Sequence, residues 1–223
     1  KIFAHGWWTN EGEKISKSEG NAIDPYDIIN HYGLDQIRYF LFREVPFGSD
    51  GDFSKDSISQ RVNADLSNNY GNLIQRTATF ILKNSNSKVS KYSNLNDEDI
   101  KLIKFYETKF KDYKSNMMKF QIDKALKNIF ELLSEANIYV DSQAPWSLKN
   151  TDLNRMNDVL YLICAIIIKS TIMLLPIIPE SALKVLQIFN IDKDNINFLN
   201  LENIVNKEIT VTNPQPIFPR IER

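Results

Sequence analysis

Between residues 54 and 188, apolar side chains recur every three or four positions, and this feature most narrows the folds open to the chain. Residues three or four apart lie on one face of a helix, so the spacing predicts amphipathic helices. The most regular run places one apolar residue at every fourth position: Ile58, Val62, Leu66, Tyr70 and Ile74. Further helices are predicted near 100–113, 122–140, 156–175 and 181–189. The fold class is therefore mainly α, without a sheet large enough to bind a nucleotide.

Residues 1–53 have a different character and form the first of two predicted units, with a helical domain at 54–223 as the second. Asp24 and Pro25 suit the start of a short helix that Gly33 ends. Asp35 is expected to cap a second helix. In the helical domain, a break is predicted at Pro145, and residues from 190 onward are expected to form an extended tail.

Composition excludes several classes of protein. The 223 residues include 27 basic and 28 acidic side chains, so a nucleic-acid partner must meet a local positive patch. Cys164 is the single cysteine, which rules out a disulfide framework and a cysteine zinc cluster, and no metal site is predicted. The apolar run 159–168 is shorter than the about 20 residues of a membrane span and is predicted to be a core helix. No signal peptide is visible, and a cytoplasmic protein is expected.

A lysine-rich loop at residues 14–21 is the most informative string, Lys14-Ile15-Ser16-Lys17-Ser18-Glu19-Gly20-Asn21. Two lysines three positions apart can both reach one polyanion, and ammonium groups suit phosphate oxygens. Gly20 offers a hinge on which the loop can move. The string by itself leaves open a second reading, a solvated turn of lysine and serine.

A polar line runs along the first long helix. Asn68, Asn72 and Arg76 are spaced i, i+4 and i+8, which places them about 200° from the apolar face at about 3.6 residues per turn. Asparagine amides suit the edges of unpaired bases, and arginine pairs with phosphate or stacks on a base. From spacing alone, an ordinary solvated helix face is the favoured interpretation.

Trp146 follows Pro145 at the junction between two predicted helices. An indole held by a rigid proline can offer a flat surface on which an unpaired base stacks. A plug between helices is an equally good interpretation of the same pair.

The lysine loop resembles the KMSKS signature of class I aminoacyl-tRNA synthetases, with Ile15 in the position of the usual methionine. Within that class the whole chain resembles the methionyl-tRNA synthetase family. The strings that carry this resemblance are His5-Gly6-Trp7-Trp8-Thr9, Ile23-Asp24-Pro25, 35–41 and 43–54. The last is the most specific, because the leucyl, isoleucyl, valyl and cysteinyl relatives share the lysine loop but not this string.

The resemblance implies an anticodon-binding α-helix bundle preceded by the C-terminal end of a Rossmann-type catalytic domain. It implies that Lys17 contacts ATP and stabilises the pyrophosphate leaving group while methionine is activated, with Lys14 assisting. Ser16, Ser18 and His5 would border the Mg-bound ATP. The family's HIGH motif, methionine pocket and zinc-binding insertion would lie upstream of Lys1, so the chain alone is expected to be inactive.

By the same resemblance, Asn72 and Arg76 read anticodon bases, Asn68 contributes, and the Pro145–Trp146 pair packs against the first anticodon base. The expected partner is tRNA(Met) with its CAU anticodon, bound by a monomer. Two alternatives stay open. One is a non-catalytic RNA-binding helical module, and the other is a related class I synthetase of different specificity, which residues 43–54 disfavour.

Overall fold

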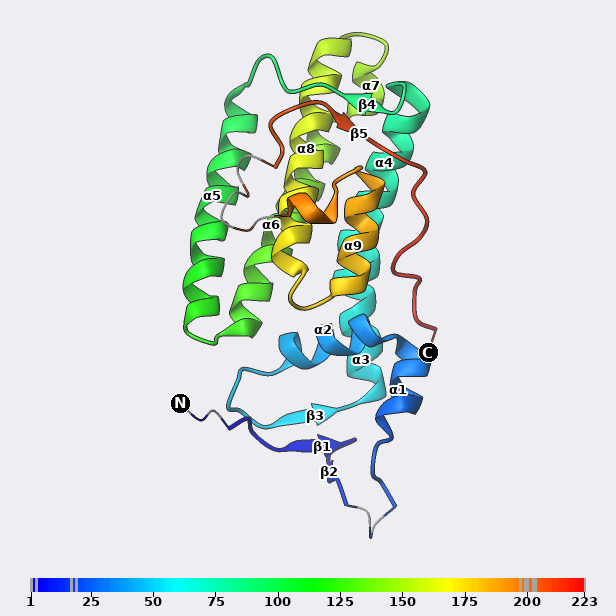
Figure 1. The fold of residues 1–223 in the computed structure, drawn as a ribbon, viewed down its shortest axis with the longest axis vertical. Coiled ribbons are helices and arrows are strands. Elements are labelled where there is room, and N and C mark those ends of the chain that lie inside the picture. The colour runs from blue at the N-terminus through cyan, green and yellow to red at the C-terminus, as the bar shows by residue number, and fades with distance from the viewer. Residues whose placement is uncertain are drawn as a thin grey trace.

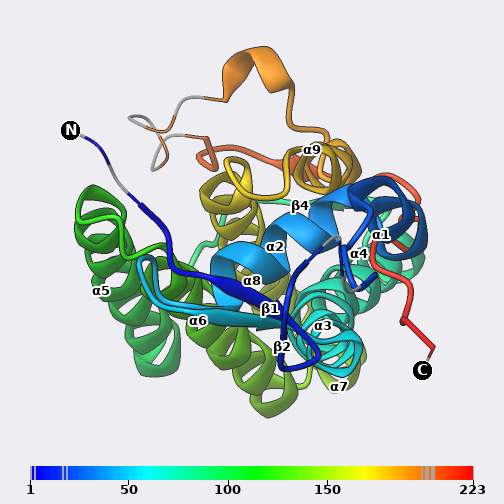
Figure 2. The ribbon, with the colours of Figure 1, turned by 90° about the horizontal axis from the view of Figure 1, so that it is seen from below.

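The computed structural model describes residues 2, 4–16, 18, 20–196, 198, 201 and 204–222. A helical bundle stands on a small three-stranded sheet, and helix α2 lies between the two (Figure 1). The view from below shows the sheet crossing beneath α2, with the ends of the bundle helices behind it (Figure 2). The mainly helical fold that the apolar spacing predicts is therefore confirmed.

The sheet has the order β2-β1-β3. Strand β1 (Trp8–Asn10) pairs antiparallel with β2 (Glu13–Lys14) and parallel with β3 (Gly51–Phe53). Helices α1 (Pro25–Tyr32) and α2 (Leu34–Glu44) lie between β2 and β3 in the chain. The predicted ends of α1 are confirmed, because the Asp24 side chain accepts a hydrogen bond from the Tyr26 N–H and Gly33 closes the helix.

Asp35 does not cap α2, so that prediction is wrong. Gly33 occupies the N-cap position of α2, and Asp35 lies inside the first turn with 4% of its surface exposed. Its Oδ2 atom accepts a hydrogen bond from the Ser181 N–H at 2.6 Å, in the first turn of α9 (Pro179–Ile188). The first N–H groups of a helix lack partners within it, and a carboxylate is favoured there. Asp35 thus supplies a hydrogen-bond acceptor to the first turn of α9, at a residue 146 positions later in the sequence.

One continuous helical rod follows the sheet, made of α3 (Lys55–Arg61), η1 (Val62–Gly71) and α4 (Asn72–Asn84). The apolar residues predicted to form one face are all buried: Ile58, Val62, Leu66, Tyr70 and Ile74. The middle of the rod is a π-helix rather than a regular α-helix. A strict period of four drifts by about 40° per step on an α-helix. On the wider π turns the same period of four drifts in the opposite direction. The two drifts offset each other, so the apolar residues stay on one face across the rod.

Helices α5 (Asp97–Met118) and α6 (Ile122–Gln143) form an antiparallel pair. Helix α7 (Pro145–Leu148) is a single turn, and α8 (Leu153–Leu174) runs through the centre of the bundle. By length and composition α8 qualifies as a membrane span, but 89% of its apolar window is buried inside the protein. The prediction of a core helix is thus confirmed. Pro179 begins α9, where its fixed backbone angle suits the first turn.

The tail beyond α9 contains a short 3-10 turn, η2 (Lys193–Asn195), and strand β5 (Ile209–Thr210), which pairs antiparallel with β4 (Lys88–Val89). It then runs down the rod (Figure 1). Asn63 donates to the Ile221 carbonyl at 2.9 Å and accepts from its N–H at 2.8 Å. Phe218 is buried, with its ring 5.7 Å from that of Tyr70. These contacts place the tail along the π-helix.

Candidate active-site loop and nucleic-acid interface

The lysine loop follows the β1–β2 hairpin, and Asn21 at its end forms hydrogen bonds to its beginning. The Asn21 amide donates to the Lys14 carbonyl at 2.9 Å and accepts from the Ser16 N–H at 2.8 Å. Its own carbonyl accepts from the Asn10 amide at 3.0 Å. The Asn21 side chain thereby joins the two ends of the loop, and its backbone carbonyl ties them to β1. The sequence motif includes Asn21 without revealing this role, although asparagine at the end of a loop commonly makes such local bonds.

The residues predicted around ATP lie at or near this loop. Lys14 and Ser18 are exposed, and the Ser16 and Ser18 hydroxyls lie 2.7 Å apart. His5 is exposed, with Nδ1 2.7 Å from the Gly6 carbonyl oxygen. Lys17 lies outside the described residues. The backbone of Gly20 is left-handed, at φ 72°, a conformation that glycine adopts without strain.

The two neighbouring tryptophans differ in their surroundings. Trp8 is half-buried against Phe40 and Phe53, with ring centroids 6.2 and 6.5 Å away. Trp7 is 78% exposed. Packing between strand and helix therefore accounts for Trp8 but not for Trp7.

Two aspartates that the sequence analysis did not single out hold the hairpin in place. Asp50 accepts a hydrogen bond from the Trp7 N–H at 2.7 Å. Asp52 Oδ1 accepts from the Thr9 hydroxyl at 2.6 Å and from the Gly12 N–H at 2.8 Å. Both aspartates belong to the string 43–54, so this stretch also anchors the hairpin that carries the lysine loop. The alternation of Asp and Gly at 50–52 was the signal available in the sequence.

On the bundle, Asn68 and Asn72 are exposed and line a groove of about 470 Å³ between the rod and the tail. Gln75 and Arg220 line the same groove, so three amide side chains and one guanidinium contribute to its wall. A second hollow of about 610 Å³ continues past Asn68 and Arg220. The π turns of η1 thus present polar side chains toward the tail, while the apolar face stays in the core.

Arg76 does not continue this line. It is half-buried, and its guanidinium donates to Asp141 at 2.8 Å and to the side-chain oxygen of Asn137 at 3.2 Å, both on α6. Arg76 lies on α4 together with Asn72, but its long side chain reaches across to α6 instead of joining the asparagines at the tail.

Trp146 stands on α7, next to the end of α6. Pro145 is buried, whereas Trp146 keeps 45% of its surface exposed. The junction therefore buries the proline and leaves much of the indole in solvent. Asp141, the partner of Arg76, lies five residues before Trp146, and α7 lies at the same end of the bundle as the C-terminal part of α4 (Figure 1).

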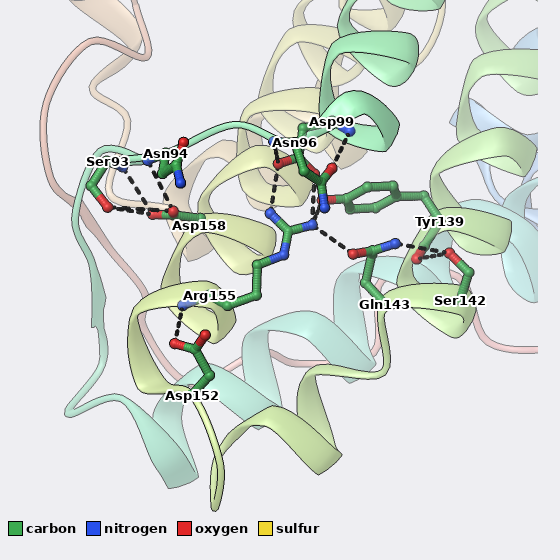
Figure 3. A network of polar contacts seen from close by, with 10 residues as sticks. All are labelled: Ser93, Asn94, Asn96, Asp99, Tyr139, Ser142, Gln143, Asp152, Arg155 and Asp158. Carbon is green, nitrogen blue, oxygen red and sulfur yellow. Dashed lines mark hydrogen bonds and ion pairs between the residues drawn. The ribbon is translucent and has the colours of Figure 1, made fainter.

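A buried ion pair joins the first turns of α5 and α8 (Figure 3). Arg155 donates from Nη1 to Asp99 Oδ2 at 2.6 Å and from Nη2 to Asp99 Oδ1 at 2.8 Å. Asp99 is 1% exposed and also accepts from the Tyr139 hydroxyl at 2.5 Å and the Asn96 N–H at 2.9 Å. Burial works against the charged form, but these hydrogen bonds outweigh it and hold the pKa of Asp99 below its ordinary value. The carboxylate therefore stays ionised in a nearly dry site.

In the parts of the chain that the structure describes, no three His, Cys, Asp or Glu side chains come together as metal ligands. The polar groups at both candidate sites are amides, hydroxyls and cations. Such groups suit phosphates and nucleobases better than a metal ion.

Comparison with known proteins points to one family. Residues 1–78 match the model described as "tRNA synthetases class I (M)", and residues 89–223 match the "Anticodon binding domain of methionyl tRNA ligase". The chain is 44% identical to the methionine–tRNA ligase of Rickettsia conorii over 99% of its own length, and 41% identical to that of Brucella suis over 99%. It spans about 44% of the length of these curated relatives.

Solved structures agree with the sequence matches. The Mycobacterium tuberculosis methionyl-tRNA synthetase in complex with methionyl-adenylate superposes with a TM-score of 0.92 at 34% identity, covering 98% of this chain and 44% of that one. The free form of the same enzyme gives a TM-score of 0.91 at 30% identity, covering all of this chain and 44% of that one.

Proposed function

Because the chain belongs to the methionyl-tRNA synthetase family, we propose that it recognises the CAU anticodon of tRNA(Met) and supplies the lysine loop for ATP-dependent activation of methionine. The helical bundle provides the anticodon site through Asn72, Arg76 and Trp146, with Asn68 beside them. The loop at residues 14–21 provides the ATP contacts. The chain spans about 44% of its relatives' length, so the proposal concerns the roles of particular residues within the larger reaction.

The observation that carries the anticodon assignment is the exposure of Trp146 above a buried Pro145. An indole with 45% of its surface in water offers a face on which a base can stack, worth about 1–3 kcal/mol per base. The buried proline restricts the backbone just before it. A base leaving the anticodon loop thus meets an aromatic surface already in position.

Arg76 supplies positive charge next to this surface. In the free protein its charge is offset by Asp141, which is 62% exposed at the side chain. Solvent screens such a pair, so it contributes little to stability and costs little to break. An RNA phosphate or base edge can therefore replace Asp141 as the partner of Arg76.

Asn68 and Asn72 supply hydrogen bonds without net charge. An amide presents a donor and an acceptor together, which matches the Watson–Crick edges of unpaired bases. Their groove is open to solvent and is lined by residues of both the rod and the tail, so a base in it can contact both. We assign discrimination among bases to these asparagines and most of the stacking energy to Trp146.

The lysine loop serves a different step. Lys14 and Lys17 are proposed to contact the phosphates of ATP, and Lys17 to stabilise the pyrophosphate that leaves when methionine is adenylated. Asn21 ties Lys14 and Ser16 together and to β1, so the base of the loop is held in place. Mg²⁺, when bound, would share the phosphate charge with these lysines.

Binding to short RNA stem-loops tests the anticodon assignment. Trp146→Ala and Arg76→Ala should each weaken binding to a CAU stem-loop, by about fivefold to 100-fold for the tryptophan. Neither should affect a stem-loop with an unrelated anticodon. Trp7→Ala is the matched control, since Trp7 is more exposed but lies at the opposite end of the molecule, beside the sheet. Equal losses on both RNAs would show that base recognition is assigned to the wrong residues.

Isotope exchange between ATP and pyrophosphate tests the loop. In a methionine–tRNA ligase that contains these residues, Lys17→Ala should lower methionine-dependent exchange strongly while leaving stem-loop binding unchanged. Unchanged exchange would favour a non-catalytic RNA-binding module instead.

A further inference from the structure

Trp146 is carried by a short segment whose two ends are joined by one hydrogen bond. Gln143 is the last residue of α6, Arg155 lies in the first turn of α8, and Arg155 Nη2 donates to Gln143 Oε1 at 2.6 Å (Figure 3). We propose that Arg155, locked by Asp99, is a positioning residue that sets the orientation of Trp146 for stacking on an RNA base. This inference rests on the proposed anticodon site and adds to it the device that keeps the site ready.

The segment between the two ends has little stability of its own. Ala144 adopts a left-handed backbone at φ 45°, which costs energy for a residue with a side chain. Helix α7 has four residues and no side-chain cap at its start. A helix this short does not persist in water without tertiary support. The orientation of Trp146 therefore depends on contacts from outside, including the burial of Pro145, the packing of α7 on α8 and the bond that joins the segment's two ends.

The segment's internal hydrogen bonds link its turns in series. The Ser147 N–H donates to the Ala144 carbonyl at 2.8 Å, and the Asp152 N–H donates to the Leu148 carbonyl at 2.8 Å. Asp152 then caps α8 by accepting from the Arg155 N–H at 2.9 Å. Direct packing of α6 on α8 sets the angle between the two helices. The bond from Arg155 to Gln143 adds a tie between the two points at which the segment leaves them.

Arg155 is suited to this task because its guanidinium cannot turn. Both of its terminal nitrogens are bound to Asp99, and Asp99 is held by Tyr139 and by the capping box with Asn96 at the start of α5. A planar guanidinium with two N–H groups fixed has its remaining N–H directions fixed too. Asp99 on α5 thereby fixes the direction in which Arg155 on α8 donates to Gln143 at the end of α6.

A pre-oriented indole binds a base without first losing freedom, so loosening it should cost affinity only when a base is present to stack. Gln143→Met removes the acceptor at similar length and leaves the Asp99–Arg155 pair intact. Arg155→Lys keeps the positive charge but loses the planar fork. Each variant should weaken binding of a CAU stem-loop about threefold to tenfold.

The test compares two RNAs by fluorescence anisotropy, using the 223-residue chain. One is the CAU stem-loop, and the other lacks the base of the first anticodon nucleotide. The variants should bind the abasic RNA as wild type does, and Gln143→Met should add nothing to Trp146→Ala in the double variant. Arg61→Lys is the control, because Arg61 pairs with Glu44 and Asp65 near the sheet, far from α7.

Fluorine NMR of the 5-fluorotryptophan-labelled chain reads the orientation without RNA. Gln143→Met should shift or broaden the Trp146 resonance while those of Trp7 and Trp8 stay in place. An unchanged Trp146 resonance, or equal affinity losses on both RNAs, would overturn the inference. If Trp146→Ala weakens binding and Gln143→Met does not, the anticodon assignment stands and the positioning role is wrong. If Trp146→Ala itself has no effect, both are wrong.

Discussion

Asp99 and Arg155 offer the sharpest test of what holds the upper end of the bundle together. Each oxygen of the Asp99 carboxylate accepts two hydrogen bonds, Oδ1 from Arg155 and Tyr139, and Oδ2 from Arg155 and the Asn96 N–H. In Asp99→Asn, either orientation of the amide turns its NH₂ group toward two donors. The substitution also leaves the positive charge of Arg155, whose side chain is 17% exposed, without a counter-charge.

Breaking a buried ion pair by removing one partner costs about 3–5 kcal/mol. A domain of ordinary stability has a free energy of unfolding of about 5–15 kcal/mol, so the loss is a large share of it. The midpoint of thermal unfolding should fall by roughly 6–20 °C for a chain of this size. Urea unfolding followed by far-UV circular dichroism at pH 7 measures the difference directly.

Acid should remove the same stabilisation from the wild-type chain. The pKa of Asp99 is lower in the folded state, so its contribution is complete above the unfolded pKa of about 3.9 and is lost as pH falls through the folded pKa. The gap between wild type and Asp99→Asn should therefore be widest near pH 7 and should narrow as pH falls below about 4.

The neighbouring exposed pair provides the control. Glu98 pairs with Lys101 on the same turn of α5, but both side chains are more than half exposed. Glu98→Gln should leave the urea midpoint unchanged at pH 7, because water screens this pair. A loss below about 1 kcal/mol for Asp99→Asn, or a gap that persists to the lowest pH at which the wild type stays folded, would refute the ion-pair account.

Other parts of the fold make separate predictions. Gly71→Val should loosen the tail, because even a Cβ atom there lies 2.9 Å from a backbone oxygen and 3.6 Å from Phe218; faster proteolysis within residues 211–222 checks this. Arg38→Ala should lower the free energy of unfolding by about 1–3 kcal/mol, since Arg38 donates to the Pro176 and Ile177 carbonyls after α8, and urea unfolding measures the loss. Cys164 should react with a thiol reagent only as the chain unfolds, because it is fully buried and burial raises its pKa; reaction before the urea transition would contradict this.

Sequence alone indicated the helices and several of their ends. Asp24, Pro25 and Gly33 define α1 by interactions within one turn, so local residue types suffice. The apolar positions of the rod also follow from the sequence, since burial of a repeating face does not depend on which helix covers it. The motif strings likewise predicted the family without reference to the fold.

The spacing of apolar residues in the rod contains a signal for the π-helix that the prediction of regular helices did not use. Apolar residues at 58, 62, 66, 70 and 74 repeat every four positions without a step of three. A regular α-helix would need steps of three among the steps of four to keep one face buried. A strict period of four therefore signals wider turns, which a count of matches to a helical template overlooks.

Tertiary structure decided which polar groups meet. Asp35 was predicted to cap its own helix but serves α9, Arg76 turns to Asp141 on α6, and Arg155 binds Asp99 across 56 residues of sequence. Helical periodicity predicts the face on which a side chain lies, but the packing of helices determines what that face meets. The sequence by itself determined that this chain is a helical bundle preceded by a lysine-rich loop. Only the packing brought Asp99, Arg155 and Gln143 together, because their partnership depends on three helices meeting at one end of the bundle.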